Sequence, residues 1–240
     1  MKRLIKWTII ILILIGLIVS ASIFYKGYQL YKETMEQVVI ADVIEEVRAR
    51  ENYVQLADMP NHLLTAIIAV EDHRFMEHNG FDIISFGRAI IRNIREKEYA
   101  AGGSTITQQL SKNLFFSFEK TLERKVAELI VAREIEDNYS KEDILELYLN
   151  VIYYGDGFES IYNASIGYFS KEPSQLSDAE ATLIAGLPQA PSAYAMIEYF
   201  DRAVNRGYQV IDAMVEHGYL TEVQGQQLKK DIENVKLQVN

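Results

Sequence analysis

The chain opens with a long apolar run that no charge interrupts. From Trp7 to Tyr25 it is dominated by isoleucine and leucine. In an α-helix these 19 residues extend roughly 28 Å, close to the thickness of a bilayer's hydrocarbon core. The bases Lys2, Arg3 and Lys6 precede the run, and positive charge on this side is typical of a cytoplasmic N-terminus and an exported remainder. The pattern predicts a cytoplasmic segment at 1–6 and a transmembrane helix at 7–25.

A cleaved signal peptide is the alternative interpretation of this run. Small residues at 19–21 (Val-Ser-Ala) resemble a cleavage site. The run is, however, longer than the usual apolar segment of a signal peptide, which has about 7–15 residues. We therefore favour a retained anchor. A core helix of a soluble protein is disfavoured because no polar face interrupts the run.

The remaining hydrophobic pattern is mostly helical. Apolar residues at helical spacing predict a helical stalk over 26–50, and a weak alternation predicts a short strand at 52–56. Asp58 is expected to cap a helix whose first turn holds Pro60. Ser140 with Asp143, and Thr221 with Gln224, have the spacing of N-terminal caps. Helices are expected at 63–70, 83–95, 105–116, 122–136, 141–150, 177–187, 199–217 and 222–235.

Length and composition narrow the class of protein. At 240 residues with 49% hydrophobic residues, the chain suits one domain with a real core plus a small appendage. There is no cysteine, which excludes disulfides and thiolate metal sites. The formal net charge of −10 argues against a protein that neutralises nucleic-acid phosphates. We expect a mainly α catalytic domain over 51–240 on a membrane anchor.

The first candidate for chemistry is the pair Glu71-Asp72, which directly follows a buried apolar helix. An acid beside an apolar wall has a raised pKa, which suits a general base or acid near neutral pH. The alternative is that both acids cap loop amides or pair with Arg74. His73 and His78 are five residues apart and do not share a helix face, so we expect packing residues and no metal site there.

The second candidate is the stretch 103–113, which is dense in hydroxyl and amide side chains. Thr105 with Gln108 has the spacing of a capping box, and Ser104 is also able to cap. Exposed amides at a helix start favour an anion such as phosphate. Gln108 and Lys112 share a helix face, as do Gln109 and Lys112. An ordinary capped helix is the alternative, but the glycines before it and the lysine along it favour a ligand site.

The third candidate is the segment 124–128, in which Glu128 lies one turn from Arg124 and Lys125. In isolation a solvent-exposed ladder of ion pairs is the better interpretation, worth a few tenths of a kcal/mol per pair. With Lys120, the two bases are also suited to holding a pyrophosphate. Two further segments, 141–155 and 180–191, read as structural helices when each is taken alone.

In their order and spacing these five segments resemble the peptidoglycan glycosyltransferases of family 51. That family includes the catalytic module of bifunctional penicillin-binding proteins and the monofunctional cell-wall transglycosylases. The resemblance covers roughly residues 52–220. The matching patterns are E-D-x-x-F-x-x-H-x-G at 71–80, G-x-S-T-I-T-Q-Q-x-x-K-N at 102–113, R-K-x-x-E at 124–128, Y-L-N at 148–150 with Gly155, and A-G-L-P-x-x-P at 185–191.

The resemblance implies a fold and a reaction. The fold is a mainly α, lysozyme-like domain with a small membrane-apposed lobe. The reaction is polymerisation of lipid II with inversion at the anomeric carbon and release of undecaprenyl pyrophosphate. The partners implied are lipid II, the growing lipid-linked glycan chain, the membrane and other cell-wall synthesis proteins. Because the chain ends at Asn240, we expect the monofunctional form.

The resemblance also implies a role for each candidate residue. Glu71 would take the proton from the acceptor hydroxyl, and Asp72 would orient that hydroxyl or support the site electrostatically. Glu128 would sit near the donor pyrophosphate, directly or through a divalent cation such as Mg²⁺ or Mn²⁺. The bases Lys112, Lys120, Arg124 and Lys125 would offset charge growing on the leaving group. The side chains expected to hold sugars and phosphates are Ser104, Thr105, Gln108, Gln109 and Asn113.

Two other functions are weighed against this one. A lytic transglycosylase or muramidase also uses a glutamate on a lysozyme-like lobe, but its neutral glycan substrate has no pyrophosphate for clustered bases to offset. An inactive lipid II-binding scaffold has no need of a carboxylate in an apolar setting. We therefore expect a polymerase with its catalytic domain outside the cytoplasm of a bacterial cell.

Overall fold

The computed structural model describes residues 2–96, 103–116 and 121–238, and these ranges are almost wholly helical. Within them there is no β-strand, and an isolated bridge joins Tyr153 to Glu159. The mainly α fold expected from the hydrophobic pattern is confirmed. The α-helices are α1 Lys2–Met35, α2 Ile40–Arg48, α3 Asn61–Glu71, α4 Ile83–Glu96, α5 Ile106–Phe115, α6 Leu122–Asn138, α7 Lys141–Val151, α8 Ile161–Phe169, α9 Asp178–Gly186, α10 Pro191–Tyr194, α11 Met196–Glu216 and α12 Glu222–Glu233. Short 3₁₀ turns occupy Leu56–Asp58, Phe75–Glu77, Pro173–Gln175 and Leu187–Gln189.

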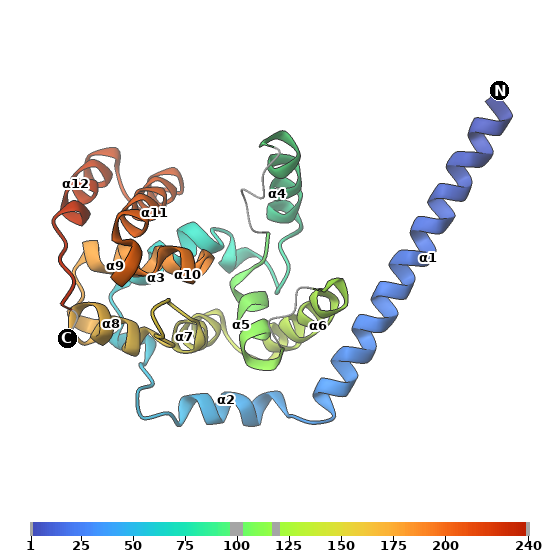
Figure 1. The fold of residues 1–240 in the computed structure, drawn as a ribbon. Helices are drawn as coiled ribbons and strands as arrows, with labels where there is room; N and C mark the ends of the chain where they lie inside the picture. The colour runs from blue at the N-terminus through green and yellow to red at the C-terminus, as the bar shows by residue number, and fades with distance from the viewer. Residues whose placement is uncertain (1, 97–102, 117–120, 239–240) are drawn as a thin grey trace.

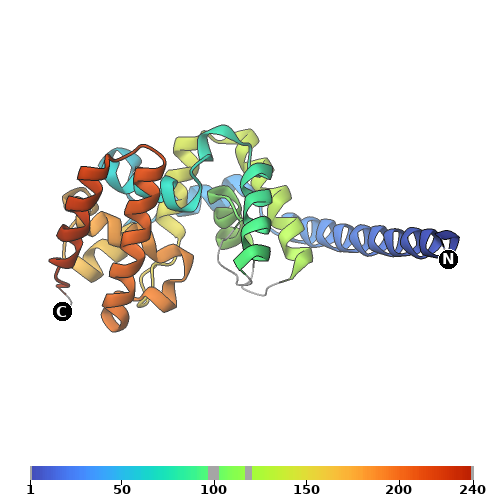
Figure 2. The same ribbon diagram turned by 90° about the horizontal axis from the view of Figure 1, so that it is seen from above.

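The helices form two groups, which Figures 1 and 2 show side by side. The larger lobe contains α3 and α7 to α12, and the smaller lobe contains α4, α5 and α6. Helix α9 is the centre of the larger lobe, because all of its residues from Ala179 to Gly186 are buried and it packs on both α3 and α11. Helix α5 joins the lobes by packing on α6 on one side and α7 on the other.

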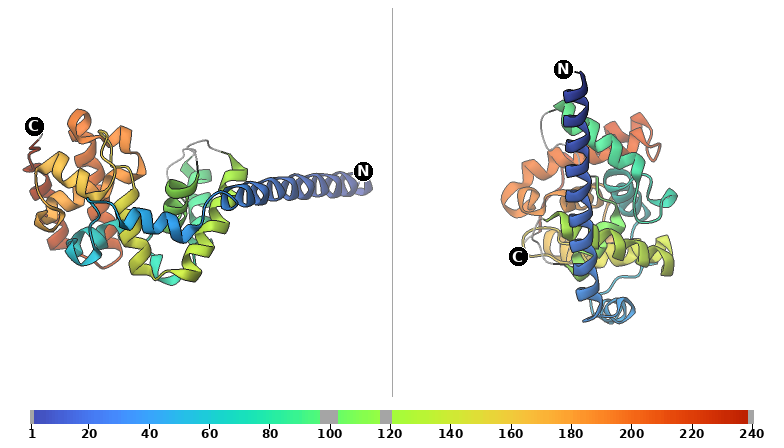
Figure 3. Two further views of the ribbon diagram at one scale, coloured as in Figure 1. Left: turned by 90° about the horizontal axis from the view of Figure 1, so that it is seen from below. Right: turned by 90° about the vertical axis from the view of Figure 1, so that its right-hand side faces the viewer.

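Helix α1 leaves the rest of the molecule as a long arm (Figure 1). The span Ile5–Met35 has a mean hydropathy of 2.7 in its most apolar window, and none of that window is buried in protein. By length and composition this helix is able to cross a membrane. The transmembrane helix and the stalk expected as separate units are one continuous helix up to Met35, and its last turns lie along α6 (Figure 3).

The segment between α2 and α3 is not the strand that its alternation predicts. Its backbone is paired with a side chain and not with a neighbouring strand. Asn150 of α7 accepts from the Val54 amide at 2.9 Å and donates to the Val54 carbonyl at 2.8 Å. Glu146 accepts from the Leu56 amide at 2.7 Å. Because these groups are satisfied by α7, the segment lies extended against that helix without forming a sheet.

Capping explains where most of the helices begin. Ser140 with Asp143, and Thr221 with Gln224, form complete capping boxes, as expected. The cap expected from Asp58 is wrong: α3 begins at Asn61 directly after Pro60, and Asp58 closes a 3₁₀ turn. Helix α8 was not predicted from the hydrophobic pattern, because aromatic and small residues occupy the positions at which polar residues would mark its exposed face.

Candidate active site

Glu71 is the last residue of α3, and its carboxyl group is almost enclosed. The side chain is 8% exposed, and Arg206 Nη2 of α11 lies 3.7 Å from its Oε1. Gln109 Nε2 of α5 donates to its Oε2 at 2.7 Å. Burial raises the pKa of Glu71, while Gln109 and Arg206 act in the opposite direction. The sequence argument for a carboxyl group with a raised pKa is therefore confirmed.

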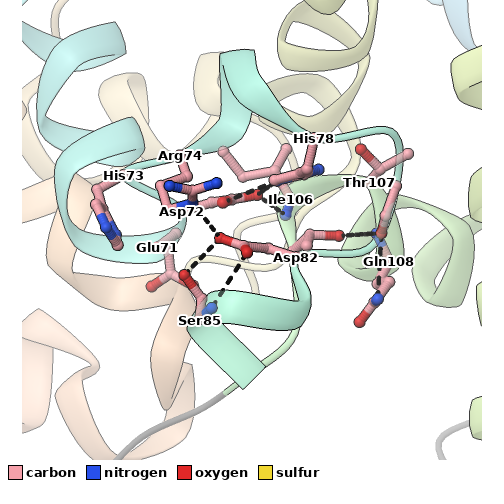
Figure 4. A network of polar contacts seen from close by, with 12 residues as sticks. Glu71, Asp72, His73, Arg74, His78, Asp82, Ser85, Ile106, Thr107 and Gln108 are labelled. Atoms are coloured by element: carbon pink, nitrogen blue, oxygen red, sulfur yellow. Dashed lines mark hydrogen bonds and ion pairs between the residues drawn. The ribbon is translucent and has the colours of Figure 1, made fainter. Parts of the chain in front are cut away.

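Asp72 follows Glu71 directly but has different surroundings. Its Oδ2 lies 2.9 Å from Nε2 of the buried His78 and accepts from the backbone amide of Ile106 at 3.1 Å. Figure 4 shows this network, which Glu71 does not join. Asp72 thus ties the end of α3 to the start of α5, and His78 is its partner within the fold. Arg74, considered above as a partner of both acids, pairs with Glu77 and Asp82.

The start of α5 is held by a loop carbonyl. Thr105 Oγ1 accepts from the Gln108 amide at 3.2 Å and donates to the Gly80 carbonyl at 2.7 Å. Gln108 Nε2 donates to the same carbonyl at 3.1 Å, so the expected capping box is only half formed. Gln108 is 1% exposed. Thr105 and Gln108 therefore position the loop and α5, and their contact with a sugar stays a prediction.

Helix α6 presents two cations to one buried carboxylate. Glu128 has a side chain that is 2% exposed, and it pairs with Arg124 through Oε1 and with Lys125 through Oε2, the latter at 3.1 Å. Lys125 Nζ also lies 2.7 Å from Ser104 Oγ. The exposed ion-pair ladder that this segment suggests in isolation is wrong for Arg124 and Glu128, whose side chains are 12% and 2% exposed beneath α5, whereas Lys125 is 38% exposed.

Lys112 brings a third cation to this cluster from α5. Burial lowers the pKa of Lys112, and the neighbouring bases lower it further, while Glu128 opposes that shift. Asn113 follows it and is partly exposed. Three cations around one carboxylate leave a surplus of positive charge for an anion. Lys120 and Gly102, also expected in the site, lie outside the described residues.

A cleft of about 440 Å³ is lined by Glu71 and Asp72. One wall comes from the end of α3 and the start of α5, including Ser104, and the opposite wall comes from α11. His73 and His217 stack at its rim with ring centroids 4.2 Å apart. Ser104 lines the cleft and also contacts Lys125. It therefore connects the part of the site around Glu71 to the cluster of Lys112, Arg124 and Lys125.

Arg206 is the residue of this site that sequence reasoning missed. It lies 135 positions after Glu71, and no motif surrounds it. Its Nε donates to the Gly186 carbonyl at 3.2 Å, and its Nη1 donates to Gln209 at 2.8 Å. One signal was present: Arg206 falls on the buried stripe of α11 together with Ala203 and Val210. A base on an apolar stripe needs a buried partner.

The described residues contain no group of three or more histidine, cysteine, aspartate or glutamate side chains arranged for a metal ion. Glu128, expected to reach a divalent cation, has both carboxylate oxygens turned toward cationic side chains. The arrangement does not suit a resident metal at this residue. A divalent cation that bridges Glu128 and the substrate pyrophosphate stays a prediction.

A larger hollow, of about 700 Å³, lies between α9, α12 and the C-terminal residues. Two of its acids have partners within the protein: Glu180 pairs with Lys171 at 2.7 Å, and Asp178 lies 3.8 Å from His62. It lacks a buried carboxyl group next to a surplus of cations. The smaller cleft beside Glu71 is therefore the better candidate site.

Comparison with known proteins finds relatives of this chain. A profile described as Transglycosylase matches residues 36–215. The chain is 44% identical over 172 residues to penicillin-binding protein 1A of Aquifex aeolicus, covering 72% of this chain and 24% of that protein. It is 43% identical over 168 residues to penicillin-binding protein 1F of Bacillus subtilis, covering 70% and 24%. The solved structure of penicillin-binding protein 1A from Haemophilus influenzae superposes with a TM-score of 0.47 at 22% identity, covering 78% and 18%.

These matches fall on one region of longer proteins, since the chain spans about a quarter of the length of the curated relatives. The matched residues include all five segments singled out in the sequence, together with α3, α5 and α6, which carry the buried carboxylates and the cations. A match over three quarters of the chain establishes the family: this protein belongs to the transglycosylases.

Proposed function

We propose that this protein polymerises lipid II into glycan strands of peptidoglycan. The 4-hydroxyl of the acceptor sugar attacks the anomeric carbon of the lipid-linked donor chain. A new glycosidic bond forms, the bond from that carbon to the pyrophosphate oxygen breaks, and undecaprenyl pyrophosphate leaves with the bonding electrons. Attack opposite the leaving group inverts the anomeric carbon.

One observation supports this proposal above the others. Lys112 belongs to the cation cluster, and Glu71 has a raised pKa. The two side chains are close enough for each to shift the pKa of the other. Gln109, the hydrogen-bond partner of Glu71, lies on the same face of α5 as Lys112, one turn earlier. A base and an anion site on one helix face suit a transfer that removes a proton on one side and releases a phosphate on the other.

Glu71 is the proposed general base. Its ionised form receives the hydroxyl proton as the new bond develops, and a raised pKa brings the proton affinity of Glu71 closer to that of the attacking hydroxyl. Gln109 fixes the orientation of the carboxylate through Oε2, and Arg206 favours its ionised form. The Oε1 atom is buried without a hydrogen-bond partner, so it is the atom best placed to accept the proton.

The cation cluster is the proposed site of the leaving group. Arg124, Lys125 and Lys112 supply positive charge where the pyrophosphate gains negative charge, and the burial of Arg124 and Lys112 strengthens their part of that interaction. Glu128 holds two of these bases in place before the substrate arrives. In this role it acts through its neighbours, by orienting their side chains toward the anion.

The membrane is the proposed location of the substrate. Helix α1 places Trp7 and Tyr25 at the two ends of its exposed apolar span, as is common for aromatic residues at membrane surfaces. Helix α4 of the smaller lobe also exposes large apolar side chains, namely Ile83, Ile84, Phe86 and Ile91. With a cytoplasmic N-terminus, both features would bring the site to the outer surface of the membrane, where tethering raises the effective concentration of a lipid-linked donor.

Two assays in parallel separate polymerisation from lytic activity and from scaffolding. The purified chain of residues 1–240 and its Glu71→Gln variant receive lipid II in one assay and finished peptidoglycan in the other. The matched control is Glu77→Gln, an exposed acid a few residues away that pairs with Arg74. We expect long glycan strands from the unmutated protein and the control, and at least a hundredfold less from Glu71→Gln.

Other results would reassign the function. Soluble fragments from finished peptidoglycan, without polymer from lipid II, would indicate a lytic enzyme. Tight lipid II binding by every variant with no turnover of either substrate would indicate a scaffold. Equal polymerisation by Glu71→Gln and the unmutated protein would remove Glu71 from the base role.

A further inference from the structure

The end of the anchor helix packs unusually closely on the helix that carries the cation cluster. Gly27 of α1 is buried, and a Cβ atom added there would lie 2.5 Å from Val126 Cβ and 2.6 Å from the Glu123 carbonyl oxygen, both on α6. Carbon atoms in contact are normally about 3.5–4.0 Å apart. Only glycine permits the two backbones to approach this closely.

A second contact lies one turn further along α1. The Tyr31 hydroxyl donates to the Glu134 carboxylate on α6, and Tyr31 is partly buried. We call these two contacts the anchor seam: Gly27 against Val126, and Tyr31 with Glu134. Two contacts on successive turns restrict both sliding and rotation of α1 against α6. Figure 3 shows the C-terminal part of α1 lying beside α6.

The anchor seam begins where the exposed apolar span ends. Tyr25 is 63% exposed, whereas Gly27 is buried. Two residues of helix correspond to about 3 Å along its axis. Val126 touches α1 at this level, and it follows directly after Arg124 and Lys125. The seam therefore places the cations of α6 within a few ångströms of the height at which a membrane around the span would end.

We propose that Gly27 is a positioning residue for the reaction: through the anchor seam, α1 holds the α6 cations at the height of the pyrophosphate on a membrane-embedded donor. This inference rests on the function proposed above and makes α1 a supporting wall of the donor site. The other face of α6 carries Glu128, whose backbone carbonyl accepts from Ser111 of α5 at 3.1 Å. A shift of α6 at the seam would consequently move the cations relative to α5.

The size of the effect follows from the overlap. A side chain at position 27 must separate the helices by about 1.3 Å to restore ordinary carbon–carbon contact with Val126. A misplacement of about 1 Å in a catalytic arrangement is able to cost 100-fold in rate. A simple tether predicts no such effect, since its contribution depends only on keeping the protein at the membrane.

The test compares two glycines of the same helix in the chain of residues 1–240, held in detergent micelles. Gly27→Leu fills the anchor seam, whereas Gly16→Leu adds the same side chain where nothing lies within 4 Å. Tyr31→Phe removes the second contact without adding atoms. Each variant is measured for thermal unfolding, for kcat and KM on lipid II, and for binding of undecaprenyl pyrophosphate against undecaprenyl monophosphate.

We expect Gly27→Leu to bind the pyrophosphate 10- to 100-fold more weakly, to bind the monophosphate less than threefold more weakly, and to lower kcat more than it raises KM. Tyr31→Phe should weaken pyrophosphate binding two- to fivefold, and Gly16→Leu should match the unmutated protein. The inference is overturned if Gly27→Leu and Gly16→Leu bind the pyrophosphate equally. It is also overturned if Gly27→Leu unfolds and Tyr31→Phe, remaining folded, binds normally. If the unmutated protein neither binds the pyrophosphate nor polymerises lipid II, the proposed function itself fails.

Discussion

Replacing Arg206 by glutamine should move the pH dependence of the reaction upward. Arg206 Nη2 lies 3.7 Å from Glu71 Oε1, and both side chains are nearly enclosed, at 6% and 8% exposure. With an effective dielectric constant of about 20, Coulomb's law gives roughly 4.5 kcal/mol for unit charges at this separation. This attraction favours the ionised carboxylate and so lowers the pKa of Glu71, against the burial that raises it.

The sign of the change follows from the role of Glu71. A general base acts when ionised, and the arginine favours the ionised form. Without it the pKa of Glu71 rises above its already raised position, so activity appears only at higher pH. Below the new pKa the rate should fall about tenfold for each pH unit of the shift, and above it the rate should recover.

The assay is kcat/KM for lipid II polymerisation as a function of pH. Arg206→Lys is the matched control, because it keeps the charge while losing the hydrogen bond from Nε to Gly186. We expect its acidic limb to move less than half as far as that of Arg206→Gln. The assigned coupling between Arg206 and Glu71 would be refuted if the acidic limb of the profile lay at the same pH in all three proteins while their unfolding temperatures were unchanged.

Three further predictions concern groups around the site. Glu128→Gln leaves Arg124 and Lys125 without their shared buried partner and should cost about 3 kcal/mol of unfolding free energy in urea titration; normal stability with normal polymerisation would contradict the role assigned to Glu128. Asn150→Ala removes both hydrogen bonds to the Val54 backbone and should cost about 1–3 kcal/mol in thermal unfolding, with KM unchanged; an altered KM would place it nearer the substrate than proposed. Gly80→Ala adds a side chain at a φ of 82° and should cost about 1–2 kcal/mol of unfolding free energy. It should also lower kcat, because the Gly80 carbonyl holds the start of α5; an unaffected kcat would show that this loop is not coupled to the site.

Helices with strong local signals were predictable from the sequence. An apolar run predicted α3, and capping boxes predicted α7 and α12. Each of these signals lies within a few consecutive residues of the sequence. The segment at 52–56 was mistaken for a strand because an alternating pattern states only which side chains face inward. Whether its backbone pairs with a strand or with Asn150, almost a hundred residues away, depends on the packing of α7.

The separate parts of the site were also visible in the sequence, and their chemistry could be argued locally. Glu71 after an apolar helix, the polar start of α5 and the bases before Glu128 each pointed to a base or an anion site. What no local pattern revealed was which side chains meet. Asp72 and Glu71 look alike as neighbours in sequence, yet one ties down α5 and the other faces Gln109 and Arg206.

By itself, the sequence determined that the protein is mostly helical, begins with a helix able to span a membrane, and carries the residues of a transglycosylase. Periodicity, caps and motifs act over one or two helical turns, and these properties follow from them. Tertiary structure alone decided that Glu128 is buried, that Arg206 reaches Glu71, and that Gly27 seats the anchor against α6. Each of these depends on contact between helices distant in sequence, and burial sets the pKa of a carboxyl group or the closeness of two backbones only once those helices have packed.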